Sequence, residues 1–120
     1  MAESIVAQKS FQFAIRIVKL YQYLKEQKQK FVLAKQLLRS GTSIGANTEE
    51  AVAAQLAPDF IYKLHLALKE TRETSYWLRL MHAVNLIESA AFESTHKDCA
   101  ELQKMLSSII LTSKKKTLNF

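Results

Sequence analysis

Apolar residues recur every three or four positions along four long stretches of the chain, which is the spacing of one face of an α-helix. The stretches cover about residues 4–27, 30–54, 58–84 and 88–113. The 120 residues include only two glycines and one proline, so few residues interrupt a helix. The pattern predicts one all-α domain over residues 1–113, folded as an up-down-up-down antiparallel four-helix bundle.

The first predicted helix is apolar around more than half of its circumference. Phe11, Ile15 and Val18 form one stripe, and a second stripe beside it contains Phe13, Ile17, Leu20, Tyr21 and Leu24. One apolar face of roughly 100° is enough to pack on the core of a monomer. We therefore expect self-association to cover the second face; the alternative is a helix at the centre of its own bundle, although each helix of so small a domain stays partly exposed.

The third predicted helix, residues 58–84, also has two apolar faces. Its second face supplies the candidate oligomer interface, and its residues are Tyr62, Leu66, Trp77 and Leu80.

Two glycines, Gly41 and Gly45, lie four residues apart on one face of the second predicted helix. Each costs about 1 kcal/mol relative to alanine inside a helix, so we expect another helix to approach closely there. The alternative is a phosphate-binding loop in which Ser43 caps a new helix. The sequence lacks the Gly-Lys-Ser/Thr that follows such a loop.

Polar residues at helical spacing on the second and third predicted helices suggest a hydrogen-bonded structural network, because buried polar groups need partners. The network would contain Ser43, Asn47, Glu50, Glu70, Arg72 and Glu73.

The net charge of +6 is unevenly distributed along the chain. Residues 1–39 carry +6, residues 40–101 carry −4 and residues 102–120 carry +4, with a basic and frayed C-terminal tail expected at 114–120. Clustered basic side chains release counterions from phosphate backbones, so RNA or DNA is a candidate partner. The candidate contacts are Lys9, Arg16, Lys19, Lys28, Lys30, Lys114, Lys115 and Lys116.

Enzymatic chemistry finds little support in the sequence. A di-metal bundle site needs two Glu-x-x-His motifs, and Glu93 with His96 is the only one present. Cys99 falls on the apolar stripe of its helix, where cysteine behaves as a small hydrophobe. We therefore expect no enzyme, no metal and no cofactor.

The single cysteine also fits a reducing compartment, and the sequence shows neither a signal peptide nor a run of about 20 apolar residues that could span a membrane. A cytoplasmic protein without membrane association is expected.

Two segments carry a family resemblance: RSGTSIGANTEEA at residues 39–51 and LALKETRETSYWLRL at residues 66–80. With Asp59-Phe60, residues 11–21 and residues 101–110, they resemble the four-helix-bundle proteins encoded in bacterial 23S rRNA intervening sequences. The resemblance implies a left-handed antiparallel bundle, a ring-shaped homopentamer and no known enzymatic reaction. That family is also similar to the accessory proteins of diversity-generating retroelements, whose basic surface binds nucleic acid and a reverse transcriptase. The alternative function is a protein-interaction scaffold, with an unidentified protein partner and no nucleic-acid role.

Overall fold

The computed structural model describes residues 2–28 and 31–118, and these form four α-helices and a short π-helix. The α-helices are α1 (Ala2–Tyr23), α2 (Phe31–Ala53), α3 (Ala57–Ala83) and α4 (Ser89–Leu118), and the π-helix η1 (Leu24–Lys28) continues α1. No strand occurs among the described residues. The prediction of an all-α, four-helix protein is confirmed.

Helix α4 is longer than the sequence pattern predicted. It continues through Lys114, Lys115 and Lys116 to Leu118, where we expected a frayed tail from residue 114. Two properties of the segment favour the helix. Lysine is a good helix former, and cationic side chains interact favourably with the C-terminal end of the helix dipole.

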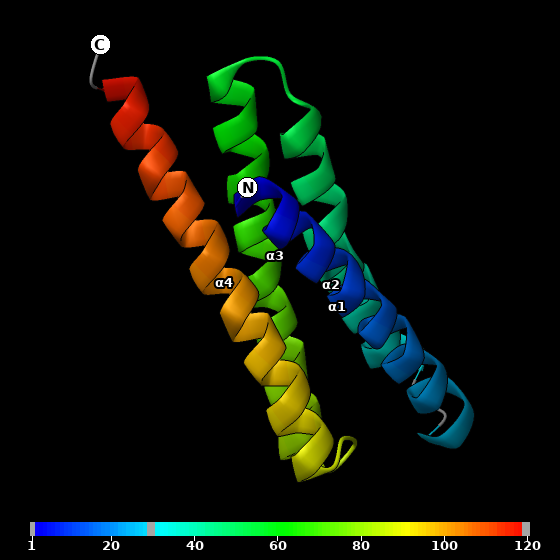
Figure 1. Cartoon of the computed structure of the whole chain (residues 1–120). Coiled ribbons are helices and arrows are strands. Elements are labelled where there is room, and N and C mark those ends of the chain that lie inside the picture. Colours follow the sequence, from blue (N-terminus) through cyan, green and yellow to red (C-terminus); the bar gives the residue numbers. More distant parts are fainter. Residues whose placement is uncertain (1, 29–30, 119–120) are drawn as a thin grey trace.

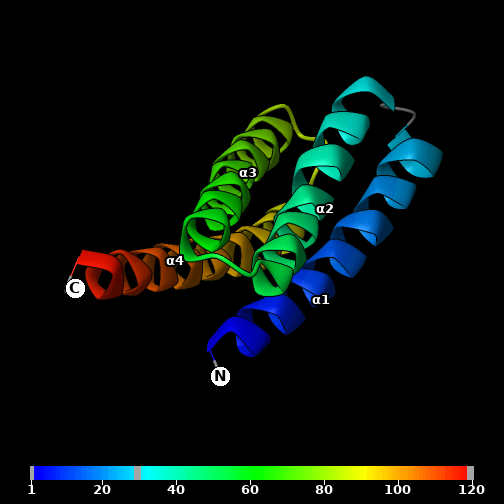
Figure 2. The ribbon, with the colours of Figure 1, turned by 90° about the horizontal axis from the view of Figure 1, so that it is seen from above.

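The four helices lie lengthwise in an elongated molecule of 54 × 21 × 21 Å (Figure 1). Helix α2 packs extensively against both α3 and α1, whereas α4 packs mainly against α3 and more lightly against α1. Figures 1 and 2 both show the C-terminal end of α4 diverging from the other helices. The last turns of α4 are therefore open to solvent, and Leu111 is exposed there.

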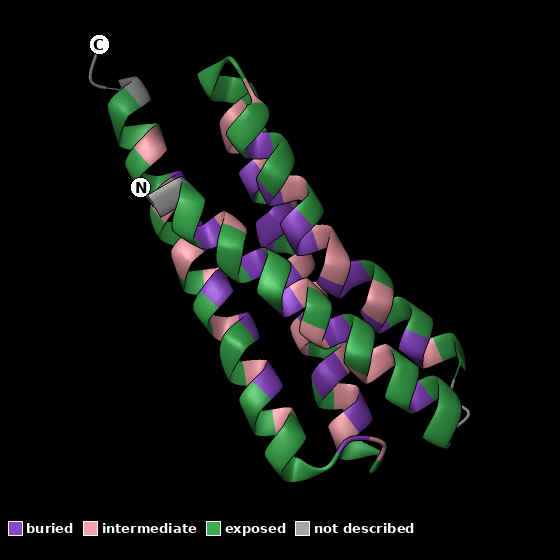
Figure 3. Ribbon diagram, turned by 45° about the vertical axis from the view of Figure 1, so that its right-hand side comes forward, coloured by how far each residue is buried: buried purple, intermediate pink, exposed green. Residues whose placement is uncertain are grey.

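All four helices contribute to one hydrophobic core, which Figure 3 shows as buried positions along the inner faces of the ribbons. Burial of a large aliphatic side chain contributes about 1.5–3 kcal/mol relative to an exposed one, so these inner faces hold the helices together. The largest fully buried apolar side chains are Val6, Ile17, Leu24, Leu37, Ile44, Leu64, Leu78, Met81, Leu102 and Leu106.

Helix α1 approaches α2 closely at the two glycines of α2. A Cβ atom at Gly41 would lie 2.8 Å from Cγ1 and Cγ2 of Ile17, and one at Gly45 would lie 3.3 Å from the carbonyl oxygen of Ser10. The expected close approach of another helix is confirmed. Because α2 runs without a break through both positions, the phosphate-loop alternative is wrong.

Helix α3 ends in a turn that satisfies its last carbonyl groups. Asn85 adopts a φ of 63°, in the left-handed region. Its N–H donates to the carbonyl of His82, and the N–H of Leu86 donates to the carbonyl of Met81. This is the Schellman pattern of a helix C-terminus, and it turns the chain toward α4.

Candidate interaction surfaces

The outer face of α1 carries an apolar strip, which consists of Phe11, Ile15 and Val18. The three side chains are exposed by 60%, 44% and 38%. Positions 11, 15 and 18 follow helical spacing, and the same helix buries Phe13 and Ile17 in the core. The two stripes predicted for this helix thus differ in environment, because one is packed and the other faces solvent.

The candidate interface residues of α3 are more covered than those of α1. Tyr62 is 60% exposed, whereas Leu66, Trp77 and Leu80 are half-buried. Trp77 packs against the core and its indole N–H donates to Glu73 Oε2 at 3.3 Å. Tyr62 is therefore the member of this group that presents most of its surface to solvent.

The predicted polar network divides into separate parts. Ser43 donates to the carbonyl of Arg39 at 2.6 Å, and Asn47 donates to the carbonyl of Ser43 at 2.9 Å. Both bonds lie within α2. Glu50 and Arg72 are exposed and make no ion pair with a described residue.

Glu70 and Glu73 meet Arg39 of α2, which is not a member of the predicted network. Arg39 pairs with Glu73, and Nη1 of Arg39 lies 3.3 Å from Oε2 of Glu70. Glu73 accepts a hydrogen bond from Arg39 and, together with the charge of Glu70, raises the pKa of Arg39. The basic partner of this cluster therefore comes from α2 and not from α3.

A second polar link between α2 and α3 lies inside the core. Thr74 Oγ1 donates to Ser40 Oγ at 3.0 Å, and both residues are fully buried. The hydroxyl of Thr74 also lies 2.7 Å from the Glu70 carbonyl of its own helix. Small hydroxyl residues at helical spacing are the only sequence signal for such a pair, and many exposed positions carry the same residues.

Two of the candidate nucleic-acid contacts are held by carboxylates of α4. Lys9 pairs with Glu101 and lowers the pKa of that carboxyl group. Arg16 Nη1 lies 2.7 Å from Asp98 Oδ2, and its Nη2 donates to Ser94 Oγ at 2.6 Å. These side chains tie α1 to α4.

The other candidate contacts are more open. Lys19 on α1 and Lys114, Lys115 and Lys116 on α4 are exposed. Lys30 and the side chain of Lys28 lie outside the described residues. Among the described residues of the predicted set, the basic side chains without an ion pair are therefore densest near the C-terminal end of α4.

The residues considered for catalysis take part in packing. Cys99 is fully buried, its thiol donates to the Thr71 carbonyl at 3.3 Å, and burial raises its pKa to about 12. His96 Nε2 lies 2.8 Å from Ser75 Oγ, and its ring stacks on Phe92. In the described part of the chain, no group of three or more His, Cys, Asp or Glu side chains is placed to hold a metal ion.

The described residues form a helical protein with polar links between its helices and with exposed apolar and basic side chains on its surface. Residues 2–108 match the sequence model of the family described as 23S rRNA-intervening sequence protein. The chain belongs to this family, as its sequence motifs predicted. Comparison with curated proteins gives no match.

A solved structure extends the likeness to the fold. The chain is similar to a protein of unknown function from the S23 ribosomal protein family of Bacteroides thetaiotaomicron VPI-5482, solved by crystallography at 1.70 Å resolution. Sequence identity is 50%, the TM-score is 0.90, and the match covers 92% of this chain and 98% of the other. None of the helices in the described residues has the length and apolar character needed to cross a membrane.

Proposed function

We propose that the protein is a non-enzymatic, homo-oligomeric helical bundle that binds RNA or DNA in the cytoplasm. The proposed topology is up-down-up-down and antiparallel, and the proposed assembly is a ring-shaped homopentamer, as the family resemblance implies. The observation that carries the oligomeric part of the proposal is the apolar strip on the outer face of α1, because a folded monomer leaves it uncovered.

The ion pairs between α1 and α4 support the antiparallel topology. The earlier residue of α1, Lys9, pairs with the later residue of α4, Glu101. The later residue of α1, Arg16, pairs with the earlier residue of α4, Asp98. Opposite chain directions produce this reversed order.

The accessible surface supports self-association. It amounts to 7459 Å², whereas a compact monomer of 13.7 kDa exposes about 6600 Å². Contiguous apolar surface on a monomer is often an interaction site. A second copy seated on Phe11, Ile15 and Val18 would remove part of this surface from water.

Light scattering on the full chain tests the assembly. We expect a mass several times 13.7 kDa at micromolar concentration, and we expect Phe11→Lys to lower it because a buried charge without a partner is costly. Gln55→Lys adds the same charge at an exposed residue beyond the strip and should leave the mass unchanged. A wild-type mass of 13.7 kDa would overturn the proposed oligomer.

The nucleic-acid part of the proposal is supported by the net charge of +6 and by the exposed lysines at the end of α4. A gel shift with RNA at rising salt tests it, because binding that depends on phosphate contacts weakens as salt increases. The alternative is a protein-interaction scaffold, which the same exposed apolar strip also favours. An oligomer that retards no RNA or DNA at low salt would select the scaffold.

A further inference from the structure

One outward face of α3 carries basic side chains and a tyrosine but no carboxylate. Its residues follow one another at intervals of four, three, four and three, which keeps them in one line along a helix. All five are exposed. We call this line the basic row, and its members are His65, Lys69, Arg72, Tyr76 and Arg79.

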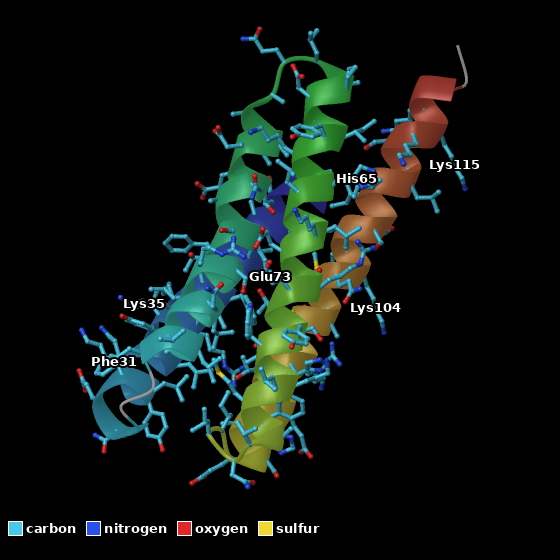
Figure 4. The ribbon with its side chains drawn as sticks, turned by 180° about the vertical axis from the view of Figure 1, so that it is seen from behind. Phe31, Lys35, His65, Glu73, Lys104 and Lys115 are labelled. Atoms are coloured by element: carbon cyan, nitrogen blue, oxygen red, sulfur yellow. The ribbon has the colours of Figure 1, made fainter. Side chains whose placement is uncertain are left out.

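No carboxylate of a described residue forms an ion pair with the basic row. The carboxylates of α3 nearest to it, Glu70 and Glu73, pair with Arg39 of α2. Figure 4 shows Glu73 between α2 and α3, and His65 at the opposite edge of α3. Between residues 65 and 79, the acids of α3 therefore pair with α2, whereas the basic row is exposed to solvent.

No ion pair with a described residue holds the side chains of Lys69 or Arg72. Arg79 Nε donates only to the uncharged hydroxyl of Ser75, at 3.4 Å. The net charge of −4 over residues 40–101 hides this row, because a segment total adds the two faces of α3 together.

Tyr76 interrupts the row with an aromatic ring at the surface. The side chain is 50% exposed, and its ring contacts Trp77 edge-on with centroids 5.1 Å apart. The contact leaves half of the residue open to solvent. A nucleic-acid base can stack on an exposed aromatic ring among cations.

We infer that the basic row binds a single-stranded nucleic acid, with phosphates on Lys69, Arg72 and Arg79 and one base on Tyr76. The inference rests on the proposed nucleic-acid role and assigns it to α3. The row extends over about 21 Å of helix, a length that suits a few nucleotides. A duplex keeps its bases stacked inside, so it offers phosphates to the row but no base to Tyr76.

Fluorescence anisotropy with a labelled oligouridine of about 15 nucleotides tests the phosphate contacts. We expect the Lys69→Gln/Arg72→Gln variant to bind at least about 10-fold more weakly and its salt slope to fall by about 1.4, since each lost contact to a single strand removes about 0.7. Lys25→Gln/Lys35→Gln removes the same charge from exposed residues of η1 and α2 and should retain the wild-type slope.

The stacking contact is tested separately at Tyr76. Tyr76→Ala should weaken oligouridine binding at least about 5-fold, the lower end of the contribution of one stacked base. Tyr76→Phe keeps the ring and should bind as the wild type does. A duplex of the same length should bind more weakly than the single strand, and Tyr76→Ala should leave the duplex affinity unchanged. Circular dichroism confirms that each variant is folded.

The outcomes separate this inference from the proposed function. If the row variant binds like the wild type while a triple Lys→Gln variant at 114–116 does not, the nucleic-acid role stands and the basic row is wrong. Equal affinity for duplex and single strand also overturns the single-strand assignment. So does an affinity for polyglutamate equal to that for oligouridine, together with no effect of Tyr76→Ala on oligouridine binding. If wild-type protein binds no nucleic acid at low salt, the proposed role fails as well.

Discussion

At the scale of single residues, Cys99 shows how burial decides chemistry. Its thiol lies in the core beside α3 and donates to the carbonyl of Thr71. Burial disfavours the charged thiolate and raises the pKa from the ordinary 9.0 to about 12. A thiol in this state is a packing group and a poor nucleophile.

Thiol labelling and pH-dependent stability test the state of Cys99. Native protein should react very slowly with a disulfide reagent at neutral pH and rapidly in denaturant. Because the folded pKa is the higher one, the contribution of Cys99 to stability is complete below about pH 9 and is lost as the pH rises toward 12. At about pH 10, the free energy of unfolding of the wild type in urea experiments should be about 1 kcal/mol lower than below pH 9. Cys99→Ala should not show this decrease. Rapid labelling of the folded protein would contradict the burial.

Gly41 gives a second prediction at the residue scale. Alanine would improve helix propensity by about 1 kcal/mol, but its Cβ would lie 2.8 Å from both γ carbons of Ile17, which is fully buried and β-branched. Overpacking costs about 1–3 kcal/mol, so we expect a net loss for Gly41→Ala in denaturant unfolding. Gly45→Ala meets Ser10 at 3.3 Å and should cost less; equal stability of wild type and Gly41→Ala would show that α1 can move away.

At the scale of helices, periodicity predicted which segments fold but not which side chains meet. The number of helices and the close approach at Gly41 follow from spacing and from the cost of glycine. The partner of Glu70 and Glu73 depends on how α2 and α3 are aligned, and a single sequence does not record this alignment. Arg72, which is near in sequence, therefore looked suitable, whereas Arg39 is near in space.

The ends of the helices were harder to predict than their middles. At α4, the basic residues 114–116 suggested a tail, although the segment contains no glycine or proline to stop a helix. The basic row of α3 could have been found from its spacing alone. The charge of a whole segment does not reveal it, because that total adds the acidic and basic faces of the helix together.

The α3–α4 turn yields a prediction at the same scale. Asn85 has a φ of 63° and completes the Schellman pattern with Leu86. Asn85→Ala should destabilise the protein by about 1 kcal/mol, because a residue with a Cβ and no local polar group resists the left-handed region. Asn85→Gly should be neutral or stabilising, since glycine suits this position. Urea unfolding of both variants measures the difference in their free energies of unfolding. Equal destabilisation by alanine and glycine would show that the backbone angle φ is not the cause.

At the scale of the whole molecule, the apolar strip and the basic row point in different directions. The backbones of α1 and α3 do not approach each other, because α2 lies between them on one side and α4 on the other (Figure 2). The strip is on the outer face of α1 and the row is on the outer face of α3. In a ring, the strip of one copy meets a different surface of the next copy. Assembly and nucleic-acid binding are therefore compatible only where that second surface is not the outer face of α3.

The concentration dependence of thermal stability tests the assembly independently of its mass. An oligomer that unfolds to separate chains becomes more stable at higher concentration, whereas a monomer does not. A tenfold increase in concentration should therefore raise the Tm by about 2–5 °C. Phe11→Lys should lower the Tm and remove this dependence, because it places a charge in the apolar strip. Lys69→Gln/Arg72→Gln changes the opposite side of the bundle and should retain the concentration dependence of the Tm. A Tm that is independent of concentration in the wild type would mean that Phe11, Ile15 and Val18 remain in water, and the proposed ring would have no cohesive surface on α1.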